Sequence, residues 1–353
     1  MKTLKNLLKI VPLLACAYAG SAQALTINFT YDPAMDARAL AGFQTAANRW
    51  QNVLHDNVQV NLNIAFAALN PGVLGSTSST QGTVSYAGFR QALINDAKTT
   101  TDLAAIANLP AGPCMSVMMN GTGINPAGSG NIATFVDNNC NENNRTIRAT
   151  WANFRALGLI PDSDKRSDGS ISFSSGFASI FDFDPTDGIG AGMIDFIGVA
   201  THEIGHALGF ISGVDTLDLN RSGGFSDALF TYIAPADVFR CSPASKAAGA
   251  DIDWSADNRD KFFSLDNCTT TLSIFSNGRT NGDGQQASHW KDNRGIGILD
   301  PTAARGELLA ISQMDLMMFD AIGWDVPEPA SIALFSLGAA ALAGSRRRKQ
   351  KQA

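Results

Sequence analysis

The most constraining feature of the sequence is residues 195–210, which read D-F-I-G-V-A-T-H-E-I-G-H-A-L-G-F. Asp195 has the side chain of a helix N-cap and Gly209 suits a helix end, so the segment predicts a helix over about residues 196–209. It contains the pattern H-E-x-x-H, which chance would place in roughly 5 of 10,000 chains with this content of His and Glu. Any fold for the chain therefore has to accommodate this helix and the chemistry of its histidines.

Two histidines and a glutamate on this helix suggest a metal site. His202 and His206 are one helical turn apart, so both imidazoles project from one face and can reach a single ion. Glu203 lies about 100° further round the helix, which is a poor position for a third ligand. From there its carboxylate can contact a water bound to the metal and act as a general base. The pattern therefore predicts a zinc ion held by the two histidines, with Glu203 as the catalytic residue.

A catalytic zinc ion needs a third protein ligand and keeps its fourth position open for water. A glutamate from a following helix is a poor choice, because the first Glu after Glu203 is Glu307, far along the chain. Extension of the motif to H-E-x-x-H-x-x-G-x-x-H, or to the same pattern ending in Asp, fails because Ser212 occupies the last position. The third ligand is therefore expected from a distant part of the chain.

The chain has four histidines, of which the predicted helix uses two. His55 falls near the end of an expected helix in the N-terminal half, where we predict a surface position. His289, in the segment S-H-W, is the one histidine downstream of the motif and is the expected third ligand. Asp215 and Asp218 are the alternatives, together with a site that has only two ligands.

Residues 201–210 together with S-H-W at 288–290 resemble the leishmanolysin-type metzincins, in which an insertion separates the motif from a third His followed by Trp. Residues 297–324 are similar to the C-terminal half of that family, and the resemblance runs from about residue 195 to 326. The helix segment also resembles that of the bacterial PEP-CTERM metalloproteases. One position departs from the family, since Leu299 stands where the Met-turn has Met, an apolar exchange of similar volume.

The resemblance implies an α+β, metzincin-like fold in two parts. A twisted N-terminal αβ subdomain, residues 25–209, would end in the active-site helix, and a loop-rich C-terminal subdomain, residues 210–325, would carry the third zinc ligand. The resemblance further implies a zinc metalloendopeptidase in which the three histidines hold the ion and Glu203 is the base. Residues 170–174 would form the edge strand along which a peptide substrate pairs.

Alternation of apolar and polar residues predicts the remaining elements coarsely. Strands are expected over residues 26–31, 58–65 and 170–174, helices over 37–55 and 86–96, and a Gly- and Asn-rich loop over 120–144. Strands that alternate with helices favour a layered α/β or α+β architecture.

Both ends of the chain have the features of targeting segments. Residues 1–24 combine three lysines, an apolar stretch and a final A-Q-A, which is typical of a secretory signal peptide. Residues 326–353 contain P-E-P, then apolar or small residues from 330 to 344, too few for an ordinary membrane span, then an Arg- and Lys-rich end. This order resembles the bacterial PEP-CTERM sorting signal. It implies transient anchoring in the inner membrane, recognition by the sorting machinery and a final location at the cell surface, in the extracellular matrix or in the medium. The alternative is a plain tail anchor.

Export places the mature chain in an oxidising compartment, where cysteines form disulfides. Four cysteines remain after the predicted signal peptide, an even set that allows three pairings. Loop closure favours the near pairs, Cys114–Cys140 and Cys241–Cys268.

The distribution of charge argues against nucleic acid as a partner. Residues 25–345 hold 18 of the 26 Lys and Arg and all 32 Asp and Glu, so no basic stripe remains to neutralise phosphates. Of these acids 28 are Asp, which favours turns, helix caps and hard-cation sites. Asp182, Asp184 and Asp187 lie close together in the sequence and suggest a calcium site, with solvated turn residues as the alternative.

Two classes of function fit these features. The first is an exported zinc endopeptidase that cuts proteins or peptides, with water as the nucleophile and Glu203 as the general base. The second is a non-catalytic surface or matrix protein with a vestigial metalloprotease fold. An intact Glu203 favours the enzyme, because a purely structural zinc site has no use for a general base.

Overall fold

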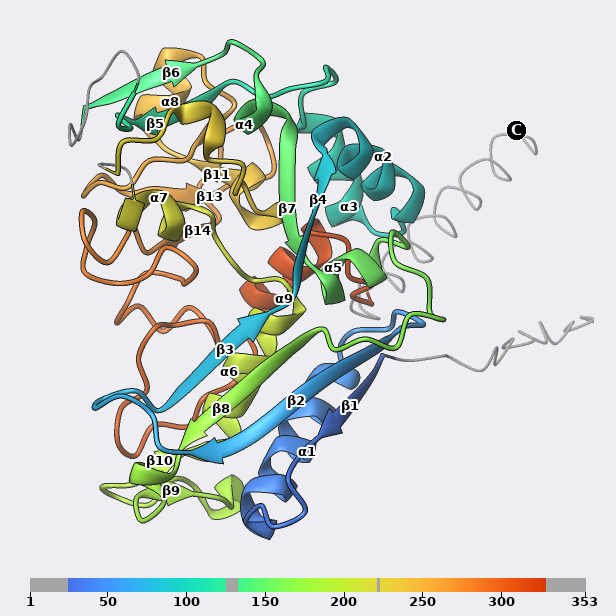
Figure 1. The fold of residues 1–353 in the computed structure, drawn as a ribbon, viewed down its shortest axis with the longest axis vertical. Helices are drawn as coiled ribbons and strands as arrows, with labels where there is room; N and C mark the ends of the chain where they lie inside the picture. The colour runs from blue at the N-terminus through green and yellow to red at the C-terminus, as the bar shows by residue number, and fades with distance from the viewer. Residues whose placement is uncertain (1–24, 125–132, 221–222, 328–353) are drawn as a thin grey trace, which may run out of the picture.

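The computed structural model describes residues 25–124, 133–220 and 223–327 (Figure 1). The predicted signal peptide, residues 1–24, and all but the first two residues of the predicted sorting segment lie outside these ranges. Within them, no helix combines the length and the apolar character needed to cross a bilayer. The mixture of helices and several small sheets confirms the predicted α+β class.

The helices are α1 (Ala37–Gln51), α2 (Tyr86–Asp96), α3 (Thr100–Asn108), α4 (Glu142–Arg145), α5 (Trp151–Ala156), α6 (Phe196–Leu208), α7 (Val214–Asn220), α8 (Pro243–Ala248) and α9 (Gln313–Ala321), with short 3₁₀ turns η1 (Ser175–Phe177), η2 (Pro185–Asp187), η3 (Asp227–Leu229) and η4 (Pro235–Phe239). The strands are β1 (Thr26–Thr30), β2 (Gln59–Ala67), β3 (Gly75–Ser79), β4 (Gln81–Ser85), β5 (Val117–Asn120), β6 (Thr134–Asp137), β7 (Thr146–Thr150), β8 (Gly169–Ser174), β9 (Phe181–Asp182), β10 (Ile194–Asp195), β11 (Arg240–Cys241), β12 (Ile252–Asp253), β13 (Lys261–Phe263) and β14 (Ser273–Phe275).

The largest sheet has four strands in the order β1-β2-β8-β3. β1, β2 and β8 run parallel, and β3 is antiparallel to β8, with Thr77 opposite Ile171. The prediction that residues 170–174 form the edge strand is therefore wrong, because they belong to β8, which lies inside the sheet. The edge strand is β3, whose sequence G-S-T-S-S has no apolar residues, so periodicity gave no sign of it.

Helices α1 and α6 lie side by side against one face of this sheet (Figure 1). Phe43 of α1, Phe173 of β8 and Phe196 of α6 are fully buried where the three elements meet. The centres of their rings are 5.0, 5.5 and 4.7 Å apart, in the tilted and edge-on contacts that aromatic rings favour. This cluster fixes the first turn of α6 against the sheet and so sets the direction of the helix that carries two histidines.

Local interactions define both ends of α6, as the sequence predicted. The Asp195 carboxylate accepts a hydrogen bond from the Gly198 N–H at 2.7 Å, and Gly209 ends the helix with a φ of 129°. Trp50 of α1 donates from Nε1 to the Thr201 carbonyl at 2.8 Å. This buried bond ties α1 to α6 one residue before the first histidine.

The smaller sheets connect distant parts of the chain. β5 pairs with β12 as well as with β6, and β4 pairs with β7. β11, β13 and β14 form an antiparallel sheet, and β9 pairs with β10 just before α6. The prediction of a loop over residues 120–144 is wrong in part, since β6 and the beginning of α4 fall within it. β6 has only four residues, which is too short a stretch for alternation of apolar and polar residues to be detected.

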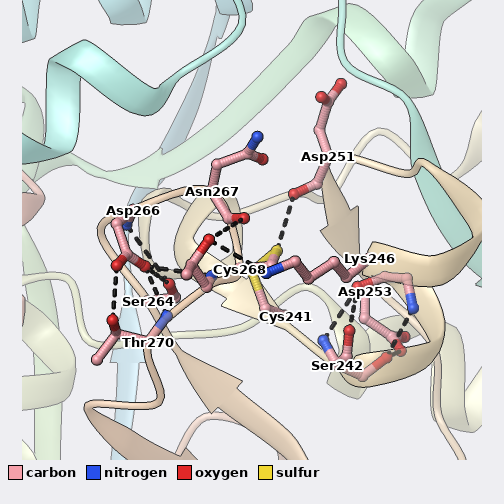
Figure 2. The surroundings of a disulfide bond; sticks show 12 residues. Cys241, Ser242, Lys246, Asp251, Asp253, Ser264, Asp266, Asn267, Cys268 and Thr270 are labelled. Carbon is pink, nitrogen blue, oxygen red and sulfur yellow. Dashed lines mark hydrogen bonds between the residues drawn. A yellow bond between two sulfur atoms is a disulfide. The ribbon is translucent and has the colours of Figure 1, made fainter.

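The structure confirms both predicted disulfides, Cys114–Cys140 and Cys241–Cys268, with Cα–Cα distances of 5.5 and 5.4 Å. Figure 2 shows the second, which fastens the turn after β13 to β11. In this turn the Asp266 carboxylate accepts hydrogen bonds from the N–H and the hydroxyl of Thr270. Asn267 has a positive φ of 54°, so the disulfide holds a turn whose backbone is uncommon for a side chain other than glycine.

Asp320 of α9 generates a prediction about pH. Its side chain is buried, and burial together with the charge of Asp102 raises the pKa of its carboxyl to about 7. The folded protein therefore keeps a proton that the unfolded chain releases at about pH 4, so stability is lost as the pH rises from there to about 7. Asp320→Asn should raise the free energy of unfolding more at pH 8 than at pH 5, as measured by urea denaturation.

Asp187→Asn, in an exposed turn, controls for the loss of one negative charge. A gain for Asp320→Asn that is the same at both pH values, or absent at both, would contradict the assignment of a raised pKa to Asp320.

Candidate metal centre

Three imidazoles meet at one point of the structure, two from α6 and one from the segment after β14. The Nε2 atoms of His202, His206 and His289 form a triangle with sides of 3.0, 3.1 and 3.3 Å. Among the described residues, no other set of three or more His, Cys, Asp or Glu side chains lies close enough to share one ion. His55 lies exposed elsewhere, where its backbone N–H donates to the Asp325 carbonyl.

Backbone carbonyls set the orientation of each ring. The Nδ1 atoms lie within hydrogen-bond distance of carbonyl oxygens, His202 with Ile298 at 2.8 Å, His206 with Phe210 at 2.7 Å and His289 with Gln286 at 3.2 Å. A carbonyl oxygen only accepts, so Nδ1 carries the proton and the neutral ring keeps its lone pair on Nε2. Three lone pairs therefore face one another across the triangle. Neutral rings in this state cannot hydrogen-bond to one another, whereas a cation between them would be stabilised.

The triangle fits a zinc ion. Imidazole nitrogens bind zinc at about 2.0–2.1 Å, and at tetrahedral angles three of them lie about 3.3 Å apart. Burial lowers the pKa of His202 and of His206 to about 4, and it lowers the pKa of His289 well below its ordinary value. All three rings are therefore neutral at pH 7, which is the protonation state that binds metal.

Glu203 contacts the edge strand β3 and is not part of the ligand group. Its Oε2 accepts a hydrogen bond from Thr77 Oγ1 at 2.6 Å, and a Cβ at Gly75 would come within 2.9 Å of Oε1. Burial raises the pKa of Glu203, while His206 and Thr77 act in the opposite direction. The carboxylate thus lies beside the histidines and outside their ligand set, in keeping with an offset of about 100° along the helix.

The third histidine, His289, is positioned by a half-buried carboxylate from α7. Asp215 accepts hydrogen bonds from Ala287 N–H at 2.6 Å, from Ser288 N–H at 3.2 Å and from the Ser288 hydroxyl. The Ser288 oxygen in turn accepts from Ser212 N–H at 2.9 Å. Asp215 and Asp218, the two alternative ligands, both lie outside the histidine group and bind loops instead. Sequence reasoning missed this positioning role because spacing alone does not reveal which loop a carboxylate contacts.

A second carboxylate, that of the buried Asp315 of α9, supports His202. It accepts hydrogen bonds from Trp290 Nε1 and from Ile298 N–H, both at 2.8 Å. The carbonyl oxygen of Ile298 is the one that lies within hydrogen-bond distance of His202 Nδ1. Leu299, at the position that matches the Met-turn, is fully buried, and a Cβ at Gly205 would be 3.2 Å from its methyl group. Leu299 therefore fills the space beside α6, and the absent side chain of Gly205 allows this close approach.

Two cavities open beside the histidines, and both are lined in part by His202 and Glu203. The first, of about 330 Å³, is bounded by residues 72–75 on one side and 300–303 on the other. The second, of about 430 Å³, extends along β3 past the other two histidines to Arg279. β3 forms a wall of both cavities, and only one of its sides is paired within the described sheet. The arrangement leaves room for an extended chain beside the histidines.

The acidic residues suggested for calcium bind backbone donors. Asp182 accepts hydrogen bonds from the N–H groups of Asp184 and Gly190, and Asp184 accepts one from Thr186 N–H. Such bonds are typical of turns. Nothing in this geometry gathers the carboxylates around one point, and the calcium site stays a prediction.

The role of Asp215 can be tested without metal. Asp215→Ala should lower the free energy of unfolding by about 2 kcal/mol, because two partly buried N–H groups and a hydroxyl lose their acceptor. The measurement is urea denaturation in the presence of a chelator, so that bound metal adds nothing to stability. Leu219→Ala, at an exposed position of the same helix, is the matched control and should change stability by less than about 0.5 kcal/mol. An Asp215→Ala protein as stable as the parent would show that Asp215 does not hold the loop of His289.

Comparison with known proteins identifies the C-terminal end of the chain. Residues 325–348 match the family model of the PEP-CTERM protein-sorting motif. No curated protein and no solved structure matches the chain. The motif marks proteins that a dedicated machinery recognises and sorts. The chain therefore carries a PEP-CTERM sorting segment and is an exported protein destined for the cell surface or the extracellular space.

Proposed function

We propose that the protein is an exported, zinc-dependent endopeptidase with a metzincin-like fold. The observation that carries the proposal is the convergence of three imidazole Nε2 atoms, each with its Nδ1 proton directed to a backbone carbonyl. Three neutral nitrogen ligands and an open side toward a cavity are what a catalytic zinc site requires. Glu203 beside them supplies the carboxylate that a hydrolase needs and a structural site does not.

Zinc, when bound, would act as a Lewis acid toward the scissile carbonyl and toward water. The protein's own part in the reaction is proton transfer and positioning. Glu203 would accept the proton of the attacking water at its carboxylate and pass it to the nitrogen of the leaving amine. The hydrogen bond from Thr77 to Oε2 orients the carboxylate and leaves Oε1 for this exchange. Burial excludes bulk water from the base and brings its pKa closer to neutral pH.

β3 is the surface on which we expect the substrate to lie. Its outer side borders the cavities beside the histidines, so a peptide could pair with its backbone N–H and C=O groups as an added strand. The hydroxyl of Thr77 bonds to both the carbonyl and the carboxylate of Glu203, at 2.9 and 2.6 Å. A peptide paired with β3 would therefore lie at a fixed distance from the base. This arrangement favours protein or peptide substrates over small molecules.

We propose that residues 330–344 anchor the protein transiently in the inner membrane until the sorting machinery acts. The second function, a non-catalytic surface or matrix protein with a vestigial metalloprotease fold, predicts the same sorting and the same fold but no peptide hydrolysis. The two functions differ in the role of Glu203, which the following experiment addresses.

Glu203→Ala should keep the fold and the bound zinc yet lose peptidase activity by roughly 10²–10⁴-fold, because the general base is not a ligand. The measurement is hydrolysis of a casein-type substrate, with zinc content determined on the same sample. Glu142→Ala, which removes an exposed glutamate well before Glu203 in the sequence, should leave activity unchanged. Undiminished turnover in Glu203→Ala would rule out its role as base, and a parent protein that cuts nothing would favour the non-catalytic alternative.

His289→Ala should lose zinc, because two imidazoles remain where three are needed. The loss of affinity should exceed the roughly 10–100-fold that is typical when a residue behind a ligand is changed. Zinc per chain is measured after dialysis against a mild chelator. His55→Ala is the matched control and should retain both metal and activity. A His289→Ala protein that still holds one zinc and still cuts peptides would overturn the ligand assignment.

A further inference from the structure

The larger cavity beside the histidines contains one feature that the proposed reaction does not use. Of the described residues that line it, Arg279 alone carries a Lys or Arg side chain, and the one acidic residue among them is Glu203. The smaller cavity has no Lys or Arg in its lining and contains two carboxyl groups, those of Glu203 and Asp300. The two ends of the substrate cleft therefore differ in charge.

The backbone around Arg279 is held in place by specific bonds. The preceding residue, Gly278, exchanges backbone hydrogen bonds across the loop, donating to the Gln285 carbonyl at 3.0 Å. The following residue, Thr280, donates its N–H to the buried Asp218 carboxylate at 2.6 Å. Gly278 has a φ of 128°, a conformation that glycine adopts readily and that turns the chain at this point. Arg279 therefore lies at the cavity on a loop whose backbone is fixed by hydrogen bonds on both sides of it.

The guanidinium of Arg279 is exposed, and within the described part of the chain it forms no ion pair with an acid. Several other exposed arginines do, as in Arg38 with Asp36 and Arg166 with Asp164. The planar guanidinium offers a fork of N–H donors that matches a carboxylate. Arg279 therefore presents a free cation to whatever occupies the larger cavity.

The direction of β3 decides which part of a peptide would meet this cation. The larger cavity follows β3 as far as Ser79 and Gln81, whereas the smaller cavity lies at the beginning of the strand, by Gly72. A peptide that pairs antiparallel to β3, the more frequent kind of pairing, enters at the Ser79 end and leaves at the beginning of the strand. Its residues before the cleaved bond would then lie in the larger cavity.

We propose that Arg279 is a specificity-determining residue that selects substrates with an acidic side chain on the N-terminal side of the cleaved bond. The inference rests on the proposed peptidase function and names its substrate class. Glu203 borders both cavities, whereas Asp300 lines the smaller cavity alone and disfavours an acidic side chain there, so the preference should be confined to one side of the bond.

The test uses the zinc-loaded secreted protein and matched fluorescence-quenched peptides. Each set carries Glu, Gln or Lys at one of three positions before the cleaved bond, which mass spectrometry locates. At one of these positions Glu should be preferred over Gln by about fivefold to tenfold in kcat/KM. Arg279→Gln should abolish the preference and Arg279→Glu should shift it toward Lys. Because Arg279 is exposed, the preference should also shrink as salt rises from about 50 to about 500 mM.

Arg294→Gln is the matched control, since Arg294 is also exposed, lies in the same half of the chain and lines neither cavity. It should keep the full preference for Glu. A Glu-to-Gln ratio that is the same in Arg279→Gln as in the parent would overturn the inference, and so would a preference found only after the cleaved bond.

A binding measurement separates this inference from the proposed function. In the Glu203→Ala background, which holds a peptide without cutting it, fluorescence anisotropy compares the Glu and Gln peptides with and without Arg279→Gln. Tighter binding of the Glu peptide that disappears with Arg279→Gln supports the role of Arg279 even if the parent cuts no peptide, in which case only the peptidase assignment fails. Equal binding of both peptides in the Glu203→Ala background would count against Arg279 whatever the activity.

Discussion

The hydrogen bonds between three imidazole Nδ1 atoms and three backbone carbonyls are the interaction on which the site depends. Each carbonyl fixes the proton on the outer nitrogen of its ring and so directs a lone pair inward. Without them the rings could rotate or change tautomer, and the three Nε2 atoms would no longer converge. The carbonyls belong to Ile298, Phe210 and Gln286, which lie on three separate segments, so the site requires all of these segments to be in place.

Three aspartates, of which Asp237 and Asp315 are buried and Asp215 is half-buried, hold those segments. Asp315 binds the turn of Ile298, and Asp215 binds the loop that presents the third histidine. Asp237 accepts hydrogen bonds from the N–H of Gly213, just after the end of α6, and from the N–H of Ala234, just before η4. Burial raises the pKa of each of these carboxyls, which is the electrostatic cost of placing an acid where it can accept several N–H bonds. The excess of Asp over Glu in the sequence has a structural use here, because a short side chain can reach the backbone without losing much freedom.

The two histidines of α6 and Glu203 contact different parts of the molecule although they lie on one helix. The histidines of α6 meet the C-terminal half of the chain, while Glu203 meets β3 of the N-terminal sheet. Because α6 is fastened to that sheet by the cluster of Phe43, Phe173 and Phe196, the base and the edge strand keep a constant relation. His289, from a loop far along the chain, can then join the two histidines of α6 without disturbing Glu203.

The sequence by itself determined the elements whose signals are local. These are helix α6 with its caps, the spacing of His202, Glu203 and His206, the near-neighbour disulfides and the sorting segment, each encoded within a few adjacent residues or favoured by short loop closure. His289 could be expected because few histidines were available. The tertiary structure decided what depends on contacts between distant residues: β3 as the edge strand, the carboxylates that position the loops, and Arg279 in the larger cavity. A strand such as G-S-T-S-S has no apolar pattern and gains its place only by pairing with β8. An aspartate or arginine likewise shows nothing in the sequence about which distant backbone or cavity it will meet, because folding alone brings those groups together.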